Sequence, residues 1–324
     1  MTSYREAGVD LDGADRHVAN ISSVVTSTWA AEVIGGFGGF AAGVEIPEGY
    51  RRPVLMMSID GVGTKLELAR RAGRWDGVGM DVVAMCVDDL AALGARPIGF
   101  VDYLAVGALD EERDLAIVTS IATACLQAGC PLLGGETAEH PGVMAPDAVD
   151  LAGAVMGVVE NGEELSPGKV SPGDLLVGLR SPNLRSNGFS LIRSLFADSL
   201  DEHLESFLAP SVIYSPSVQR AASTGAVHSA AHITGGGIIG NIPRSLPAHL
   251  GATIDTSAWA VPPVFESVAA MGMPREEMFR TFNMGIGFCL VVDPELLDEV
   301  LEATAEHEPA VIGVVTAGGG LDIR

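Results

Sequence analysis

Short apolar runs that end in glycines and a polar side chain recur along the first half of the chain. The run from Pro53 to Ile59 leads into Asp60-Gly61-Val62-Gly63-Thr64-Lys65, and the run from Pro131 to Leu133 leads into Gly134-Gly135-Glu136. Apolar runs of this length, bounded by glycine, are typical of buried strands. We therefore predict strands at 53–59 and 131–133, each with an acid at its carboxyl end. Further strands are predicted at 97–106 and 150–159.

Helical spacing of apolar residues separates these strands. The segment 110–127 has Asp110 as a candidate N-cap, acids in its first turn, and Gly129 just past its end. These signals are typical of the two ends of a helix. Amphipathic segments at 16–28 and 81–93 predict two more helices.

The helix predicted at 81–93 carries two adjacent acids on different faces. Asp89 shares a face with Val82, Met85, Cys86 and Leu93, whereas Asp88 lies about 100° round the helix among small residues that solvent can reach. A carboxylate within an apolar stripe needs a metal, a donor or a cation. We predict that Asp89 shares a magnesium ion with Asp60; the alternative is a salt bridge to Arg96.

A polar segment with two Ser-Pro-Gly turns, residues 161–173, divides the chain. We predict an N-terminal domain at 1–165 and a C-terminal domain at 166–324 in which strands and helices alternate. In the second domain, a strand at 228–233 leads His232 into Thr234-Gly235-Gly236-Gly237, and a helix is expected at 238–246. The helix N-terminus would favour an anion at the glycines, and His232 would add a titratable donor. A structural hydrogen bond is the alternative role for this histidine.

Composition limits the classes of partner. The 324 residues have 48% hydrophobic content and a formal net charge of −23, which argues against nucleic acid and acidic membranes. No apolar run approaches the roughly 20 residues of a membrane span, and no secretory signal is visible. The four cysteines are scattered in apolar surroundings, so reduced thiols and a cytoplasmic location are expected.

The stretch Asp60 to Lys65 has the chemistry of a polyphosphate site. A carboxylate takes a metal, while backbone N–H groups at Gly61 and Gly63, the Thr64 hydroxyl and the Lys65 ammonium take phosphate oxygens. It is not a P-loop, because threonine precedes lysine. A plain strand, turn and helix start is the alternative. The run Gly35-Gly36-Phe37-Gly38-Gly39-Phe40 is either a loop over a ligand or a tight surface turn.

Taken together, these stretches resemble the phosphoribosylformylglycinamidine cyclo-ligase family, also called aminoimidazole ribonucleotide synthetases. The resemblance extends over nearly the whole chain in sequence order. The matching stretches are Tyr4 with Ala7–Asp10, Gly35–Phe40, Asp60–Lys65, Met85–Leu90, Gly134–Glu139, Ser186–Ser190, His232–Gly237 and Arg280–Gly287.

The resemblance implies a two-domain fold of the α+β or α/β class. The N-terminal domain would have a mixed sheet with helices on one face and would form a homodimer by pairing sheets. The C-terminal domain would be a layered α/β/α unit. The implied activity is ATP-dependent closure of the imidazole ring of formylglycinamidine ribonucleotide, with magnesium, in purine biosynthesis. ATP phosphorylates the formyl oxygen, and a nitrogen of the same molecule then displaces phosphate.

The resemblance also implies roles for individual residues. His232, Lys65 and Asp89 would be catalytic, and Asp60, Asp89 and Glu136 would hold the metal. ATP would contact Asp60, Gly61, Gly63, Thr64, Lys65, Gly134, Gly135 and Glu136. The ribonucleotide substrate or its phosphate would contact Ser186, Asn187, Thr234, Gly235, Gly236, Gly237 and Asn283.

Several positions differ from the usual family pattern. Phe189 stands where members usually have tyrosine, the lysines that they tend to carry in the segment matching 22–28 are missing, and 210–214 differs from their Pro-Thr-Arg-Ile-Tyr. Arg185 stands where members usually have histidine, and Asp88 stands where they usually have asparagine. A paralogue that uses the same ATP chemistry on another amide or amidine therefore stays open as an alternative. A non-catalytic nucleotide-binding dimer is a second alternative.

Overall fold

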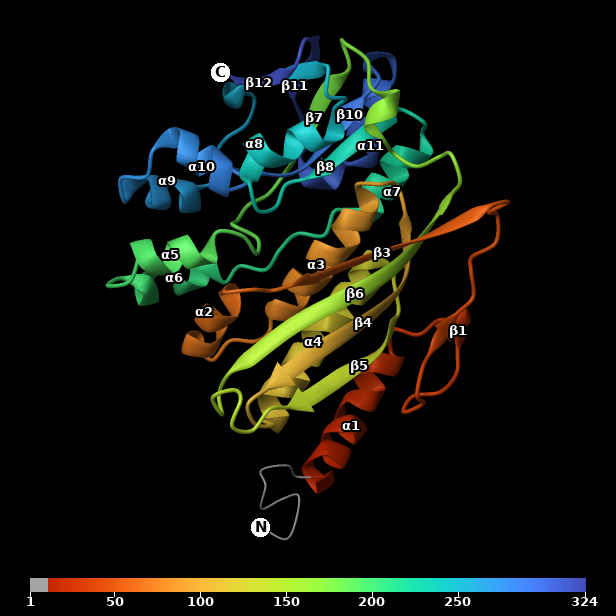
Figure 1. Cartoon of the computed structure of the whole chain (residues 1–324), viewed down its shortest axis with the longest axis vertical. Helices are drawn as coiled ribbons and strands as arrows, with labels where there is room; N and C mark the ends of the chain where they lie inside the picture. Colours follow the sequence, from red (N-terminus) through yellow and green to blue (C-terminus); the bar gives the residue numbers. More distant parts are fainter. Residues whose placement is uncertain (1–10) are drawn as a thin grey trace.

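The structure is a computed structural model that describes residues 11–324. Figure 1 shows two sheet-and-helix units, with the N-terminal unit below the C-terminal unit and α3 and α7 between them. The stretches Tyr4 and Ala7–Asp10, which contribute to the family resemblance, lie outside the described residues.

The N-terminal unit contains a mixed sheet of four strands in the order β3-β6-β4-β5. β3 and β4 run antiparallel to β6, while β5 runs parallel to β4. The helices α3 and α4 cover one face, and α1 lies along the β5 edge (Figure 1). The elements are α1 (Leu11–Thr26), β1 (Val33–Ile34), β2 (Gly43–Val44), β3 (Pro53–Gly61), α2 (Lys65–Ala72), α3 (Val78–Ala91), β4 (Arg96–Val106), α4 (Glu111–Ala128), β5 (Leu132–Glu139) and β6 (Val149–Glu160).

The alternation of side chains along β3 determines the two faces of this sheet. Because successive side chains of a strand point to opposite faces, Val54, Met56, Ser58 and Asp60 point toward the helices. Leu55, Met57 and Ile59 lie on the other face and are 50%, 74% and 75% exposed. Figure 1 shows no helix over that face. The N-terminal sheet thus leaves a row of apolar side chains uncovered.

Caps and a close helix contact position α3 and α4. The Asp110 carboxylate accepts a hydrogen bond from the Arg113 N–H at the start of α4, and Gly129 ends the helix with φ +66°. These two predictions are confirmed. Gly79 lets α3 approach α4, because a Cβ there would lie 2.2 Å from the backbone nitrogen of Ile121. The approach buries α3 on nearly all sides, with the sheet on one side and the C-terminal unit on another.

The C-terminal unit contains six strands in the order β12-β9-β11-β7-β10-β8, antiparallel except for the β12–β9 pair. Successive side chains of β7 and β10 point to opposite faces of this sheet and join two apolar clusters. One cluster includes residues of α8, α9 and α10, and the other includes residues of α7 and α11. Helices therefore cover both faces, and the predicted α/β/α layering is confirmed. The elements are β7 (Leu175–Arg180), α5 (Phe189–Leu195), α6 (Leu200–Phe207), α7 (Ser215–Ser223), β8 (Val227–His232), α8 (Gly237–Asn241), β9 (Leu250–Ile254), α9 (Pro263–Ala270), α10 (Arg275–Thr281), β10 (Ile286–Val292), α11 (Leu297–Ala303), β11 (Ala310–Ala317) and β12 (Gly320–Ile323).

Two predicted elements differ from the structure. Gly134, Gly135 and Glu136 lie inside β5 instead of in a turn after it. The helix expected at 238–246 is the five-residue α8, followed by a 3₁₀ turn at Ile242–Ser245. Pro243 lacks the N–H that an α-helix would use, so the helix stops there. A helix this short directs little positive potential at the preceding glycines.

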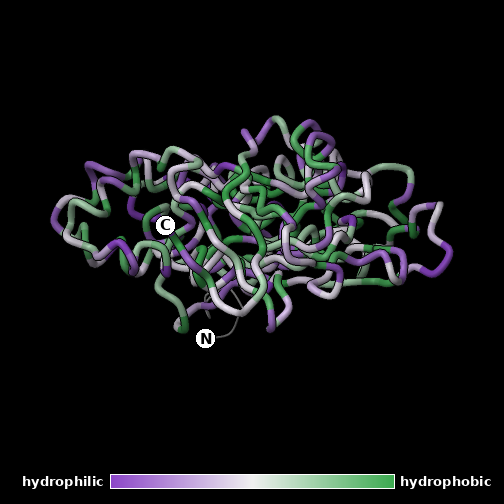
Figure 2. Tube along the Cα trace, turned by 90° about the horizontal axis from the view of Figure 1, so that it is seen from above, coloured by the Kyte–Doolittle hydropathy of each residue, from purple (hydrophilic) through white to green (hydrophobic). Residues whose placement is uncertain are grey.

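Apolar residues gather toward the middle of the molecule and hydrophilic residues toward its outer loops, as Figure 2 shows from above. Among the described residues, no helix is both long and apolar enough to cross a membrane. The boundary predicted at 165/166 falls between β6 and β7 and stays a prediction.

Candidate active site

Two acids and a histidine from both units meet between the domains. Ser58 and Asp60 come from the end of β3, Asp89 from the last turn of α3, and His232 from the end of β8. His232 Nδ1 lies 2.8 Å from Asp89 Oδ1, and the Ser58 hydroxyl donates to Asp89 Oδ2 at 3.2 Å. Asp89 is thus held by groups from two domains. Among the described residues no salt bridge joins it to Arg96 or to another arginine, and Arg244 acts on it only through its charge. We call Ser58, Asp60, Asp89 and His232 the acid cluster.

The two carboxyls of the acid cluster titrate in opposite directions. Burial raises the pKa of Asp60, and the negative charge of Asp89 raises it further, against the hydrogen bond that Asp60 accepts from the Gly61 N–H. Burial also acts to raise the pKa of Asp89, but the hydrogen bond and charge of His232, the hydrogen bond from Ser58 and the charge of Arg244 outweigh it and leave the pKa lowered. A divalent cation would relieve the repulsion between these two acids, so the donor set fits magnesium.

His232 faces the protein interior. Its side chain is 3% exposed, its ring stacks on Phe288 at 5.9 Å, and Nε2 lies 3.9 Å from Asp88 Oδ2 with no hydrogen-bond partner among the described residues. Nδ1 is directed at Asp89 and Nε2 is buried, so neither nitrogen is exposed to solvent. In this structure His232 therefore positions Asp89 and does not present a free donor to a ligand.

Asp88 is fully buried, and the prediction that solvent reaches it is wrong. Arg185 donates to Asp88 Oδ2 at 2.8 Å, and both side chains are 0% exposed. Asp88 Oδ1 accepts from the N–H groups of Tyr214 and Ser215 at 2.8 and 2.9 Å. The side of α3 that carries Asp88 packs against the C-terminal domain, where small residues allow a close approach. Arg185 and Asp88, two of the departures from the family pattern, are therefore partners in one ion pair.

Lys65 is also an internal residue. Its ammonium donates to Asp81 at 2.9 Å and to the backbone carbonyls of Arg185 and Ala209 at 3.1 and 2.9 Å, and its side chain is 1% exposed. An ammonium has three donors, and all three are used here. No donor of the Lys65 ammonium is left for ATP in this arrangement, and its predicted catalytic role and ATP contact stay predictions. The neighbouring Gly63 and Thr64 are exposed, and their predicted contacts stay predictions.

The predicted substrate residues divide into two groups. Asn283 is buried and structural, since it donates to the Asn183 carbonyl at 2.9 Å and accepts from the Gly285 N–H at 2.7 Å. Asn187 lies near Met85 of α3, at 3.9 Å from its sulfur, and it also borders the glycine loop, because a Cβ on Gly235 would lie 3.5 Å from its amide oxygen. These contacts place Asn187 beside the acid cluster.

The loop Thr234–Gly237 keeps its shape through Asn241. The Asn241 amide donates to the carbonyls of Gly235 and Gly237 at 3.1 and 2.9 Å. Gly236 has φ +95°, and at Gly237 a Cβ would lie 2.3 Å from the Phe279 carbonyl oxygen. Both positions therefore require glycine. Ser186 precedes Asn187 in the sequence. Its hydroxyl is buried and has no hydrogen-bond partner among the described residues.

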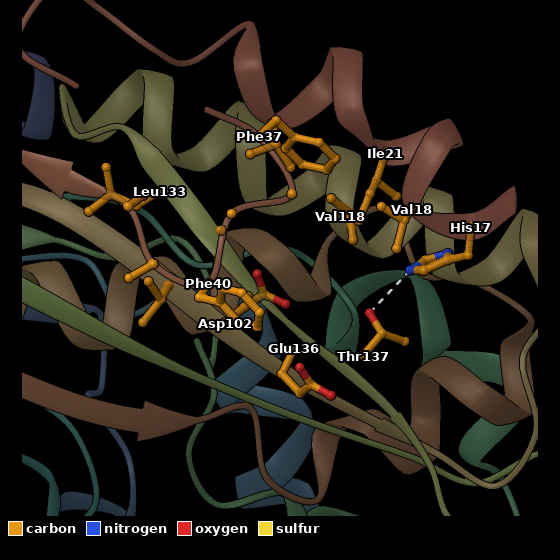
Figure 3. A pocket seen from close by; sticks show the side chains of 18 of the residues that line it. His17, Val18, Ile21, Phe37, Phe40, Asp102, Val118, Leu133, Glu136 and Thr137 are labelled. Atoms are coloured by element: carbon orange, nitrogen blue, oxygen red, sulfur yellow. Dashed lines mark hydrogen bonds between the residues drawn. The ribbon is translucent and has the colours of Figure 1, made fainter. Parts of the chain in front are cut away.

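A second candidate site lies at the opposite edge of the N-terminal sheet. A cavity of about 540 Å³ lies between α1, the glycine run Gly36–Phe40 and β5. Figure 3 shows the side chains around it. Gly134, Gly135 and Glu136 line it, together with Asp102 of β4. We call it the glycine pocket. The glycine run is thus part of a ligand-sized cavity, and Asp102 is a lining residue that we did not single out; an acid within the apolar strand 97–106 was the available signal.

The predicted metal set of Asp60, Asp89 and Glu136 is not brought together within one chain and stays a prediction. Asp60 lies on β3 and Glu136 on β5, the two outer strands of the sheet. Three strand spacings of about 4.8 Å separate them. Among residues 11–324, no cluster of three or more histidine, cysteine, aspartate or glutamate side chains is arranged to hold a metal.

Comparisons with known proteins agree with both domains. The profile of the AIR synthase related protein N-terminal domain matches residues 38–159, and that of the corresponding C-terminal domain matches residues 171–324. A phosphoribosylformylglycinamidine cyclo-ligase from Synechococcus sp. (strain CC9605) is 42% identical over 97% of this chain and 95% of its own length.

Two solved structures share the fold. The hydrogenase maturation protein HypE in complex with ATP aligns with a TM-score of 0.68 at 19% identity, covering 92% of this chain and 86% of that chain. Thiamine-monophosphate kinase from Stenotrophomonas maltophilia K279a aligns with a TM-score of 0.66 at 17% identity, covering 95% and 94%. The confirmed two-domain architecture and the identity across nearly the full length lead to one assignment: the chain belongs to the phosphoribosylformylglycinamidine cyclo-ligase family.

Proposed function

We propose that the protein is an ATP-dependent ligase that closes the imidazole ring of formylglycinamidine ribonucleotide, giving 5-aminoimidazole ribonucleotide, ADP and phosphate. ATP phosphorylates the formyl oxygen, and a nitrogen of the same molecule attacks the activated carbon and displaces phosphate. An amide-type oxygen is a poor leaving group, whereas phosphate is a good one. The observation that carries the proposal is the acid cluster, in which Asp60 and Asp89 are held between the domains beside the glycine loop Thr234–Gly237.

The glycine pocket is proposed to hold the nucleoside of ATP. Its volume of about 540 Å³ is within the range of small-ligand sites. Apolar side chains of α1 and α4 supply walls for a base, and the glycine run places backbone amides without side chains at its mouth. Glycines allow phosphate oxygens to approach the backbone closely.

Magnesium fits Asp60 and Asp89, whose charges repel one another. When bound there, it would neutralise the charge of the transferred phosphoryl group. Asp89 is oriented by His232 and Ser58, so its carboxylate is held in place before any ligand arrives. Asn187 and the loop Thr234–Gly237, which border this cluster, are proposed to bind the ribonucleotide substrate.

A homodimer is proposed to complete the site. Within one chain, α3 and α4 lie between the glycine pocket at the β5 edge and the acid cluster at the β3 edge. Pairing of the uncovered sheet faces would bury Leu55, Met57 and Ile59 and bring a second chain across the sheet. We place the nucleoside in the pocket of one protomer and its phosphates at the acid cluster of the other. Met57→Lys should then yield monomers in sedimentation experiments.

The difference at Arg185 does not change the proposed substrate. The guanidinium is used inside the protein by Asp88, the Gly287 carbonyl and the Val212 carbonyl. Among the described residues, no hydrogen bond or ion pair joins Arg185 to a member of the acid cluster. The observation that would have favoured a paralogue with another substrate therefore has an internal explanation.

Incubation of the purified protein with formylglycinamidine ribonucleotide, ATP and magnesium tests the proposal. The expected result is stoichiometric formation of ADP and 5-aminoimidazole ribonucleotide, and growth of a purine auxotroph that lacks this activity. A folded protein that hydrolyses ATP only with another amide substrate would show a paralogue instead. A folded protein that binds ATP and turns over neither substrate would show a non-catalytic role.

A further inference from the structure

The side chains of the glycine pocket are mostly apolar, with few polar groups. Figure 3 shows Val18, Ile21, Phe37, Val118 and Leu133 around the cavity. The polar side chains that line it are His17, Asp102, Glu136 and Thr137. His17 Nε2 and the Thr137 hydroxyl satisfy each other at 3.1 Å. Two carboxyl groups remain for a ligand.

Asp102 is the inner of these two carboxyls. It lies on β4 between Phe100 and Leu104, which are both buried against the helices, and it points to the same face of the sheet. Glu136 is exposed and pairs in register with Tyr103, whose side chain is on the opposite face. The two carboxyls therefore do not converge on one ion, and Asp102 alone borders the apolar interior of the pocket.

The chain leaves room for the Asp102 carboxyl. A Cβ on Gly135 would lie 2.3 Å from Asp102 Oδ1, so any larger residue at position 135 would displace the carboxyl. Among the described residues, no other side chain donates a hydrogen bond to Asp102. An acid without a side-chain partner in a mostly apolar cavity is costly to the fold, which points to a ligand that pairs with it.

We propose that Asp102 selects adenine in the glycine pocket by pairing with the N6 amino group and N1 of the ATP base. This inference rests on the proposed function, because it takes ATP as the nucleotide. A neutral carboxyl group offers one donor and one acceptor side by side. Adenine presents the complement, an N6–H donor next to the N1 acceptor. Guanine presents two adjacent donors, N1–H and N2–H, which suit a charged carboxylate instead.

The environment of Asp102 favours the neutral form. Burial raises the pKa of Asp102 to about 7. The titratable groups near it on this face are the Cys125 thiol from α4 and His17 from α1, while β6 contributes Gly153 opposite it and Glu136 of β5 lies on the other face. None of these supplies a fixed cation. Because the folded pKa is raised, the neutral form dominates below pH 7 and is lost as pH rises above it.

Calorimetric titration of ATP and GTP at pH 6 and pH 8.5 tests the proposal. If only the neutral form pairs with adenine, the apparent Kd of the wild type for ATP should rise on the order of tenfold or more across this range. Asp102→Asn keeps one donor and one acceptor, so it should bind ATP at pH 6 nearly as well as the wild type and lose that rise. Asp102→Ala should bind ATP weakly at both pH values and discriminate poorly against GTP.

Glu136→Gln is the matched control, because it removes the other carboxyl of the same pocket and should keep the wild-type pH dependence. Titration of the ATP phosphates affects every variant equally and cancels in the comparison. Asp102→Asn with the full wild-type pH dependence, or Asp102→Ala with unchanged affinity and ATP preference, would overturn the inference while ring closure stands. A wild type that neither binds ATP nor forms product would overturn both proposals.

Discussion

Asp88 and Asp89 are neighbours on α3 but belong to two different regions of the molecule. Around Asp88, Arg185 and backbone N–H groups from the C-terminal domain complete a closed ion pair with both side chains 0% exposed. Around Asp89, a histidine and a serine leave the side chain 45% exposed, beside a second acid. The first region has balanced charge and is closed to solvent and ligands. The second has excess negative charge and is open to them.

The difference separates structural from functional charge. A buried ion pair whose charges cancel is costly to break but has no excess charge left for a ligand. Two acids that repel one another retain capacity for a cation and its phosphate oxygens. Lys65 and Asp81 follow the first pattern, since Asp81 also accepts from the Ser211 N–H and hydroxyl. Asp60 and Asp89 follow the second.

The largest expected effect comes from opening the closed pair. Arg185→Ala leaves Asp88 buried without its cation, so the free energy of unfolding should fall by about 3–5 kcal/mol. Urea unfolding measures this change, with the exposed Arg193→Ala as control. A loss in Arg185→Ala no larger than that of the control would show that the ion pair does not hold the domains together.

Lys65→Met tests the same region from the N-terminal side. Removal of the ammonium leaves the Asp81 carboxylate buried, and the free energy of unfolding should fall by about 3 kcal/mol. The KM for ATP of the protein that remains folded should change less than about threefold, since Lys65 contacts no ligand in this account. A tenfold rise in KM with intact stability would restore Lys65 to the nucleotide site.

The smallest effect is expected for the residue that positions Asp89. His232→Gln should lower kcat by about tenfold, as is common when a group that orients a metal-binding carboxylate is removed. Because His232 helps to lower the pKa of Asp89, its loss should raise that pKa and shift the acid limb of the kcat–pH profile to higher pH. Ser58→Ala, which removes a weaker partner, should shift the limb less. An unmoved acid limb would show that His232 does not act through Asp89.

Local sequence patterns predicted much of the fold. The ends of α4 followed from Asp110 and Gly129, and β3 and β4 followed from their apolar runs. The prediction that solvent reaches Asp88 on α3 failed because the spacing argument assumes a helix with one face in solvent. α3 has the sheet on one side and the C-terminal domain on another, so Asp88 is buried and Asp89 lies at the domain border.

The partners of the charged residues could not be read from local patterns. The ammonium of Lys65 reaches backbone carbonyls 120 and 144 residues away, and Arg185 reaches Asp88 across 97 residues. The position of Lys65 after a glycine turn suggested a ligand contact, but that position carries no information on burial. Asp102 was not predicted as a site residue because no motif includes it. Its position within an apolar strand was the only local signal.

One pair of substitutions tests the distinction between these regions most directly. Asp88→Asn and Asp89→Asn remove neighbouring negative charges from one helix with the same change in chemistry. We expect Asp89→Asn to lower kcat by at least about a hundredfold, or about 2.7 kcal/mol, while the free energy of unfolding stays within about 1 kcal/mol of the wild type. Asp88→Asn should instead lower the free energy of unfolding by about 2–3 kcal/mol and keep kcat near the wild-type value. An Asp89→Asn protein with wild-type turnover, or an Asp88→Asn protein that is fully stable but inactive, would contradict the account.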